Sequence, residues 1–395
     1  MMKEVQIKMS KFYKFMNSKF MLSLIFFLLL KPGSFSEYTA WKNIGNVINI
    51  LRLFTCTWCL FYFLLKRSKI DKFILFIILF YFSLLFSTFY FSLSYANLIF
   101  EFVSILSWIV LFKINMFDNK DLFLTTLENI FLILLLINFV TIILFPGGFY
   151  LNSSGYSGNY FLGYDNNLIT YIFPALALSF TNSLNRNGKI GIKSIFLTVI
   201  SFFSIIFTWS ATGVVSMVIM IVLFSMYTIK KKDFPIKKYI VVALSLFIGI
   251  VFLRFQNIFS FIIEGWLKKD LTFTGRTYIW DIFINEIKKS ILIGHGVVDN
   301  KYLIYTLNAG HAHNYFLQIL YQGGIVTFSM FLGFFFSAIN KVKNCNEKKY
   351  VGIVIFAYLI SFIFEAYSLT DMFIIVLLIA YYYEPSSKKL NGVEI

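Results

Sequence analysis

The chain has 395 residues, of which 59% are hydrophobic and 14% charged, whereas an ordinary globular protein has roughly 45–50% apolar and about 25% charged residues. So much apolar surface cannot all be hidden from water, so lipid must be the solvent, which excludes a cytosolic enzyme, a secreted disulfide scaffold and a disordered protein. The net charge of +16 does not indicate nucleic-acid binding, because the basic residues lie between apolar segments rather than on one face.

Apolar segments follow one another along the chain, and most approach the roughly 20 residues that the hydrocarbon core requires. Because backbone amides in lipid need partners within their own segment, each is predicted to be a helix. The expected fold is an all-α, polytopic membrane protein of about 12 transmembrane helices, in one domain over residues 1–395. The predicted spans are 19–35, 44–65, 73–93, 95–112, 123–145, 167–185, 193–209, 211–229, 239–255, 313–339, 350–367 and 371–383.

Lysine and arginine are concentrated in every second connection between these spans. The amino-terminal segment contributes Lys3, Lys8, Lys11, Lys14 and Lys19. Such an alternation places the basic connections, and both termini, in the cytoplasm. The first apolar run is followed by Lys31-Pro32-Gly33 and not by a small-residue cleavage site, so a retained span is expected rather than a cleaved signal peptide.

The exterior loop at 146–166 lacks lysine and arginine and is crowded with glycine, asparagine and tyrosine. Two interpretations stay open for it. Its tyrosines and asparagines can stack on and hydrogen-bond to a sugar, or they form an interfacial aromatic belt joined by turn residues.

The second exterior loop, 256–312, is far longer than any other connection, and long loops in compact proteins are usually functional or disordered. Its aromatic and isoleucine content argues against disorder. Trp280, Phe283, Ile287 and Ile291 are spaced 3, 4 and 4 apart, which predicts an amphipathic helix lying along the membrane surface. The following Ile293-Gly294-His295-Gly296 is typical of a turn, so His295 is interpreted as a loop residue rather than a ligand.

The candidate general base is His313, where a glycine-containing loop enters the next span. The positive end of a helix dipole disfavours a second positive charge, so the imidazole is expected to stay neutral and accept a proton. The alternative is an interfacial histidine with a backbone partner. A metal pair with His311 is not favoured, because a spacing of two puts the side chains on different helix faces.

Arg276 lies in Thr274-Gly275-Arg276-Thr277, just before the predicted amphipathic helix. Its fork of donors suits the paired oxygens of a diphosphate. Snorkelling to lipid headgroups explains an arginine at this position equally well.

Taken together, these motifs resemble the O-antigen ligase/polymerase superfamily, which includes the Wzy-type capsular and O-antigen polymerases. The resemblance rests on Thr274-Gly275-Arg276 with Trp280, then Ile293-Gly294-His295-Gly296, then His311-Ala312-His313-Asn314 running to Gly323-Gly324. The family's pattern of His-Asn, nine residues, Gly, two residues and Gly, Thr or Tyr is matched by His313, Asn314, Gly324 and Thr327. Arg254 with Gly265 fits a further Arg-x10-Gly pattern of such polymerases.

The resemblance implies glycosyl transfer from a polyprenyl-diphosphate donor at the outer face of a bacterial cytoplasmic (inner) membrane, without metal or other cofactor. It implies that His313 is catalytic. Substrate binding would fall to Arg276, Arg254, Asn314, Trp280 and His311. The implied partners are the lipid-linked oligosaccharide, membrane lipid, a chain-length regulator and a flippase, and no nucleic acid.

The predicted activity is polymerisation of lipid-linked oligosaccharide repeats into a capsular or O-antigen-type polysaccharide. A ligase that passes a finished glycan from the same donor to another acceptor is the close alternative. A flippase for the lipid-linked repeat is disfavoured, because transporters place their charged groups near the bilayer midplane. Five polar residues within or beside spans are functional or pairing candidates: Arg52, Glu101, Glu128, Glu365 and Asp371. For Arg52, pairing with Glu101 or Glu365 is the favoured interpretation.

Overall fold

The computed structural model describes residues 18–66, 68–91, 93–152, 155–230, 232–266, 268, 270–342, 348–367 and 372–385. The predictions on Lys3, Lys8, Lys11, Lys14 and Asp371 lie outside the described residues. The first half contains α2 (Lys19–Leu30), α3 (Ser34–Glu37), α4 (Lys42–Leu65), α5 (Lys72–Tyr90), α6 (Ala96–Asp118), α7 (Lys120–Leu144), β1 (Asn159–Tyr160), β2 (Gly163–Tyr164), α8 (Leu168–Asn187) and α9 (Ile192–Thr208). The second half contains α10 (Ala211–Ile229), α11 (Ile236–Phe247), α12 (Arg276–Lys289), α13 (Asn300–Leu307), α14 (Tyr315–Val342), α15 (Lys349–Phe364) and α16 (Phe373–Tyr382).

Every predicted span overlaps one of these helices, and the all-α membrane class is confirmed. Among the described residues, six helices are long and apolar enough to cross a membrane, and α2, α9, α15 and α16 are shorter apolar helices. The count of twelve spans therefore stays a prediction.

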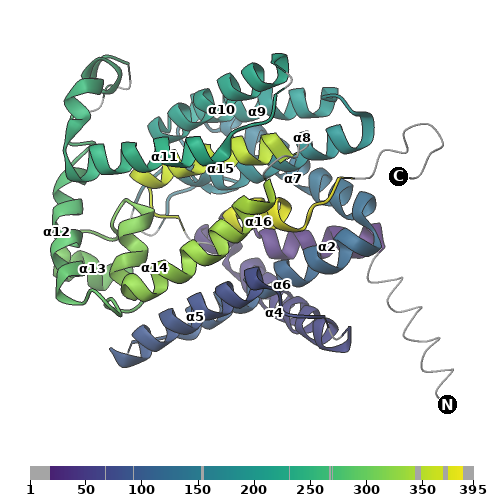
Figure 1. Cartoon of the computed structure of the whole chain (residues 1–395), viewed down its shortest axis with the longest axis horizontal. Helices are drawn as coiled ribbons and strands as arrows, with labels where there is room; N and C mark the ends of the chain where they lie inside the picture. Colours follow the sequence, from purple (N-terminus) through teal and green to yellow (C-terminus); the bar gives the residue numbers. More distant parts are fainter. Residues whose placement is uncertain are drawn as a thin grey trace.

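The core of the bundle is built around α15 and α16. Almost every side chain of these two helices is buried, as expected for helices that are apolar on all faces. They pack against α8, α10, α11 and α14, and Figure 1 shows them in yellow at the centre of the bundle. By contrast, α4 exposes many large apolar side chains, which suits a helix that faces lipid at the edge of the bundle.

One end of the bundle carries the segment between α11 and α14. A π-helical turn (Ile248–Phe252) extends α11, and α12 runs across the ends of the bundle helices (Figure 1). The predicted amphipathic helix exists, but it ends at Lys289, so Ile291 lies beyond it. Its apolar residues Trp280 and Phe283 are fully buried, and the ring centroids of Phe283 and of Tyr321 in α14 are 4.9 Å apart. This face is covered by protein, and the prediction that the helix lies along the membrane surface stays a prediction.

A break in α14 receives the glycine-containing turn that follows α12. Gly324 has φ 64° and ψ −165°, far from helical values, and a Cβ there would meet the Leu292 carbonyl oxygen at 2.3 Å. The backbone N–H of His295 donates to the Tyr321 carbonyl at 2.7 Å, and that of Gly296 donates to the Gln322 carbonyl at 2.8 Å. The Tyr321 and Gln322 carbonyls, which lose helical partners at the break, thus regain hydrogen bonds. The turn at 293–296 and the Gly323-Gly324 pair therefore pack against each other.

The polar residues within spans have structural partners. Glu128 accepts hydrogen bonds from Ser179 and Asn182 at 2.8 and 2.6 Å, as buried charges in membranes require. Arg52 lies over the Phe100 ring at 4.9 Å. The suggested pairing of Arg52 with Glu365 is wrong, because Glu365 forms its ion pair with Arg276.

Candidate active site

The turn before α12 sets the position of Arg276. Three successive residues, Phe273, Thr274 and Gly275, have φ between 53° and 81°, in the left-handed region that only glycine enters without strain. The Asp270 carboxylate holds this turn by accepting from the Thr272 hydroxyl and from the backbone N–H of Thr272 and Thr274. The hydrogen bond from the Thr272 hydroxyl is the main reason that the pKa of Asp270 lies below its ordinary value. Arg276 is therefore the first helical residue, at a fixed place.

The Arg276 side chain binds a buried carboxylate from a distant part of the chain. Its Nη2 donates to Oε1 of Glu365 at 2.5 Å, and the two side chains are 18% and 7% exposed. Glu365 is the residue directly after α15. Since Arg276 has five N–H donors in a planar fork, this ion pair leaves further donors for an anion.

His313 approaches the other oxygen of the same carboxylate. Its Nδ1 lies 3.6 Å from Oε2 of Glu365, slightly beyond hydrogen-bond length, and catalytic hydrogen bonds are often long before substrate binds. Burial raises the pKa of the Glu365 carboxyl, but the neighbouring His313 and Arg276 outweigh burial and hold that pKa below its ordinary value. An ionised carboxylate thus lies between an imidazole and a guanidinium.

His311 completes this group, which we call the arginine–histidine cluster (Arg276, Glu365, His313 and His311). The two imidazole rings are 3.9 Å apart between centroids, and His311 Nδ1 accepts the backbone N–H of His313 at 3.2 Å. Burial, with a smaller effect of His313, lowers the pKa of His311 to about 4. His311 is therefore neutral near pH 7, in keeping with its role as acceptor.

Two fully buried residues hold the loop that carries His313. Asn314 Oδ1 accepts the N–H of Leu317, capping α14, while its Nδ2 donates to the Ile363 carbonyl at 2.9 Å. Trp280 Nε1 donates to the His313 carbonyl at 3.4 Å. Both side chains are 0% exposed, so the structure places Asn314 and Trp280, two predicted substrate-binding residues, behind the cluster, where they position it.

Arg254 has a different environment. Its guanidinium lies 5.5 Å from the Trp280 ring centroid and pairs with the exposed Asp281 carboxylate at 2.5 Å. The Arg254 backbone is left-handed, at φ 58°. Arg254 is connected to the cluster by way of Trp280, which it contacts and which binds the His313 carbonyl. Arg254 does not line the cavity described next.

A cavity of about 410 Å³ opens beside Arg276. One wall is apolar and comes from α10, α11 with its π-helical turn, and α15; it includes Ile219, Leu246, Ile250, Ile360 and Ile363. Among the described residues that line the cavity, Arg276 is the one cation. Such a combination of one cation with an apolar wall suits an amphiphilic anion.

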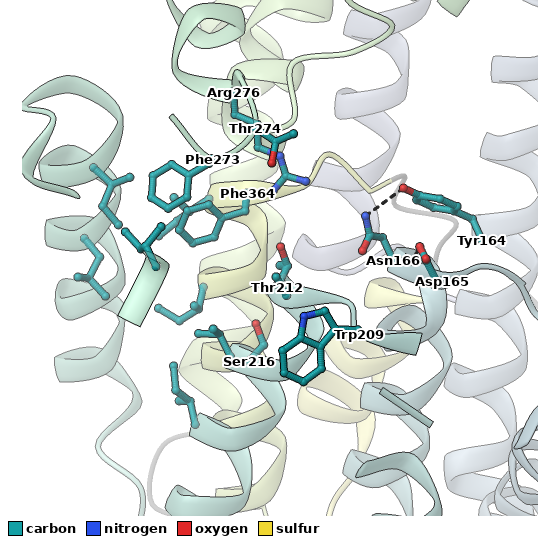
Figure 2. A pocket seen from close by; sticks show the side chains of 18 of the residues that line it. Tyr164, Asp165, Asn166, Trp209, Thr212, Ser216, Phe273, Thr274, Arg276 and Phe364 are labelled. Atoms are coloured by element: carbon teal, nitrogen blue, oxygen red, sulfur yellow. Dashed lines mark hydrogen bonds between the residues drawn. The ribbon is translucent and has the colours of Figure 1, made fainter. Parts of the chain in front are cut away.

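The opposite wall comes from the loop at 146–166, which we call the tyrosine–asparagine loop, and from the start of η2 (Asp165–Asn167). Tyr156, Tyr164, Asp165 and Asn166 line the cavity, and Figure 2 shows Arg276 and Tyr164 on its two sides. Burial, then Asp165 and Glu365, raise the pKa of Tyr164 to about 12 against the opposing effect of Arg276. The tyrosine–asparagine loop and the segment that carries Arg276 therefore act on one another electrostatically.

Sequence reasoning did not identify Trp209 or Ser216 as site residues, and it considered Asp165 and Asn166 only as part of the loop at 146–166. Trp209 ends α9, and Ser216 is a buried α10 residue whose hydroxyl has no hydrogen-bond partner in the described part of the chain. Nothing in their spacing distinguishes them from interfacial or helix-packing residues. The sequence marks Glu365 only as a polar residue near a span and as a candidate partner of Arg52, because its partners in the structure lie 52 and 89 residues away in the chain.

Comparison with known proteins gives one finding. Residues 196–332 match the family model Wzy_C, described as O-Antigen ligase, which confirms the resemblance to the O-antigen ligase/polymerase superfamily. The matched range contains Arg254, Arg276, His311 and His313, and Glu365 lies outside it. No curated protein and no solved structure matches the chain.

Proposed function

Starting from the match of residues 196–332 to the O-antigen ligase family, we propose that this chain is a polysaccharide polymerase. It joins oligosaccharide repeat units carried on a polyprenyl diphosphate, at the outer face of the bacterial cytoplasmic membrane. The observation that carries the proposal is the cavity in which Arg276, a cation with spare donors, adjoins a long apolar wall. A lipid diphosphate has the same two parts, a polar dianionic group and an apolar chain.

The diphosphate is the leaving group, and Arg276 binds it. As the bond to the anomeric carbon breaks, its electron pair passes to the leaving diphosphate oxygen, where the guanidinium stabilises the growing charge. The ion pair with Glu365 keeps the Arg276 side chain in place before substrate arrives. Preorganised charge of this kind contributes the larger part of many enzymatic rate enhancements.

His313 removes the proton from the acceptor hydroxyl as the hydroxyl oxygen attacks the anomeric carbon. With Nδ1 facing Glu365, Nε2 is the nitrogen left to accept that proton. Glu365 fixes the ring and stabilises the imidazolium that forms, as the carboxylate does in a Ser-His-Asp triad. His311, Asn314 and Trp280 position the His313 loop, and Arg254 supports Trp280.

The test is a reconstitution with purified protein in lipid nanodiscs and synthetic lipid-diphosphate repeat units, without added metal or nucleotide. We expect a ladder of products that differ by one repeat unit. His313→Ala and Arg276→Ala should remove the ladder while both proteins still insert and purify. A normal ladder from both variants would exclude the arginine–histidine cluster as the active site.

A ligase remains the second candidate, because the matched family is described as O-Antigen ligase. Both reactions need the same donor site and base, so the acceptor distinguishes them. A polymerase makes the ladder from repeat units alone, whereas a ligase forms product only after a different acceptor is added.

A further inference from the structure

An apolar surface, a cation and a polar surface follow one another along the cavity. Figure 2 shows Arg276 between Phe273 and Phe364 on one side and Tyr164 and Asn166 on the other, and all five line the same cavity. A lipid-linked sugar donor has the order lipid, diphosphate, sugar. If Arg276 binds the diphosphate, as the proposed function holds, the surface beyond it faces the first sugar.

Trp209 provides an aromatic surface in the same cavity, next to Ser210, which binds the Asn166 side chain. Trp209 ends α9 with φ 52°, in the left-handed conformation that glycine usually adopts at this position and that is a genuine outlier for a bulky residue. Strained residues of this kind are concentrated at ligand sites. The indole is 51% exposed and lines the cavity, so its face is available for the apolar face of a sugar ring.

Asp165 and Asn166 provide polar groups with fixed directions. Asp165 accepts from the Tyr156 hydroxyl at 2.7 Å and from the Asn166 N–H at 2.6 Å. Asn166 donates to the Tyr164 hydroxyl at 3.2 Å and accepts from the Ser210 hydroxyl at 2.7 Å. Because a carboxyl oxygen accepts more than one hydrogen bond, Asp165 can also accept from sugar hydroxyls.

Ser210 connects these two features, since it follows Trp209 directly and binds the Asn166 side chain. The same Ser210 hydroxyl caps α10, accepting the Gly213 N–H at 3.4 Å. The aromatic surface and the polar groups are therefore held in one fixed relation before any ligand binds, as a specificity pocket requires.

We propose that Trp209, Asp165 and Asn166 form a subsite for the first sugar of the donor, the sugar joined directly to the diphosphate. The ligand class is a pyranose with neighbouring hydroxyl groups. This subsite selects which lipid-linked glycan enters the reaction, while Arg276 reads only the diphosphate.

The experiment compares probes that differ only in the sugar. Farnesyl diphosphate, used throughout as its terminal methyl ester so that it carries the same charge as the sugar-linked probes, is titrated into the purified full-length protein in nanodiscs. Farnesyl diphosphates that carry glucose, galactose, N-acetylglucosamine or N-acetylgalactosamine are titrated in parallel. For wild type, we expect at least one sugar probe to bind about tenfold more tightly than farnesyl diphosphate, a gain of the size that one or two good polar contacts provide.

Asp165→Asn and Trp209→Ala should lose that gain and keep the wild-type affinity for farnesyl diphosphate, which also shows that they fold. Trp266→Ala is the matched control, because Trp266 is 72% exposed and is not among the residues that line the cavity. Arg276→Ala should weaken binding of every probe.

Each result has one meaning for the subsite. If no sugar probe binds wild type more tightly than farnesyl diphosphate, or if Asp165→Asn and Trp209→Ala both retain the full gain, the subsite is overturned. If Arg276→Ala binds farnesyl diphosphate as tightly as wild type, the diphosphate site fails instead, and with it the proposed function.

Discussion

The arginine–histidine cluster, through Arg276, and the tyrosine–asparagine loop both line one cavity, but they are built differently. The cluster collects charged and titratable side chains from three places in the chain, the start of α12, the entry to α14 and the end of α15, and it holds them by one buried carboxylate. The loop supplies neutral hydroxyls, an amide and one carboxylate from a single short stretch. The cluster is suited to moving charge and protons, and the loop to recognition.

The largest effect should come from the imidazole of the cluster. General-base assistance contributes typically about 10²–10⁴-fold, so His313→Ala should slow product formation by that factor while leaving donor affinity near the wild-type value. Single-turnover rates and donor titrations on the same preparation measure the two quantities. A rate within tenfold of wild type would move the base elsewhere, with Asp165 of the opposite wall as the first group to test.

Arg276→Ala should lower both donor affinity and rate. Losing one preorganised donor at a developing charge typically costs about 10²–10³-fold in rate. Arg276→Lys should recover only part of this loss, because lysine lacks the planar fork that binds two oxygens at once. Full activity in Arg276→Lys would show that a point charge is sufficient and that the ion-pair geometry with Glu365 is unimportant.

Glu365→Gln tests whether the carboxylate that Arg276 and His313 share makes these two residues act together. The amide keeps the shape but removes the negative charge between Arg276 and His313. We expect a rate loss of about 10- to 100-fold, as for a partner that orients a ligating histidine. This is less than the roughly 10⁴-fold loss in a Ser-His-Asp triad, because His313 Nδ1 lies 3.6 Å from the carboxylate. A double-mutant cycle with His313→Ala supplies the decisive measurement. Additive losses would mean that Glu365 acts independently of His313.

The arginine–histidine cluster and the tyrosine–asparagine loop also differ in how much of each the sequence predicts. Arg276 and His313 lie in a loop rich in charged and titratable residues, so the sequence singles them out only by their place in motifs that resemble the O-antigen ligase/polymerase superfamily. Asp165, Asn166 and Trp209 have the composition of any membrane-interface loop, and only the fold shows that they line the cavity with Arg276. Glu365 is a further case, because pairing across 89 residues depends on how α15 and α12 pack.

The same contrast applies to the fold. Each of the twelve spans predicted from apolar length overlaps a helix, because lipid requires internal hydrogen bonds whatever the neighbours are. The break at Gly324 and the docking of Gly294 on it could not be deduced from periodicity, since both glycines are explained only by a close backbone approach. The burial of Trp280 likewise depends on a partner, α14, that begins 35 residues later in the chain.

Acid should destabilise the cluster by way of His311. Its native pKa of about 4 lies below the ordinary value near 6.5, so below pH 6.5 the unfolded chain binds the proton first and stability falls with pH. Between pH 7 and pH 5 the expected loss is about 2 kcal/mol, and the depressed pKa of Glu365 adds to it only at lower pH. Thermal unfolding of wild type and His311→Gln across this range tests the assignment, and equal slopes would contradict it.

Arg254→Ala should give the smallest change, and it separates the two arginines that the sequence treats alike. Arg254 pairs with Asp281, whose side chain is 64% exposed, and exposed ion pairs contribute only about 0–1 kcal/mol. Its contact with Trp280 supports the His313 loop indirectly, so we expect less than a fivefold loss of rate and unchanged affinity for farnesyl diphosphate. Asp281→Ala is the matched control, since it removes the ion pair and keeps the guanidinium over Trp280. A loss as large as that of Arg276→Ala would place a second cation on the diphosphate, and the donor would then have to extend beyond the cavity toward α12.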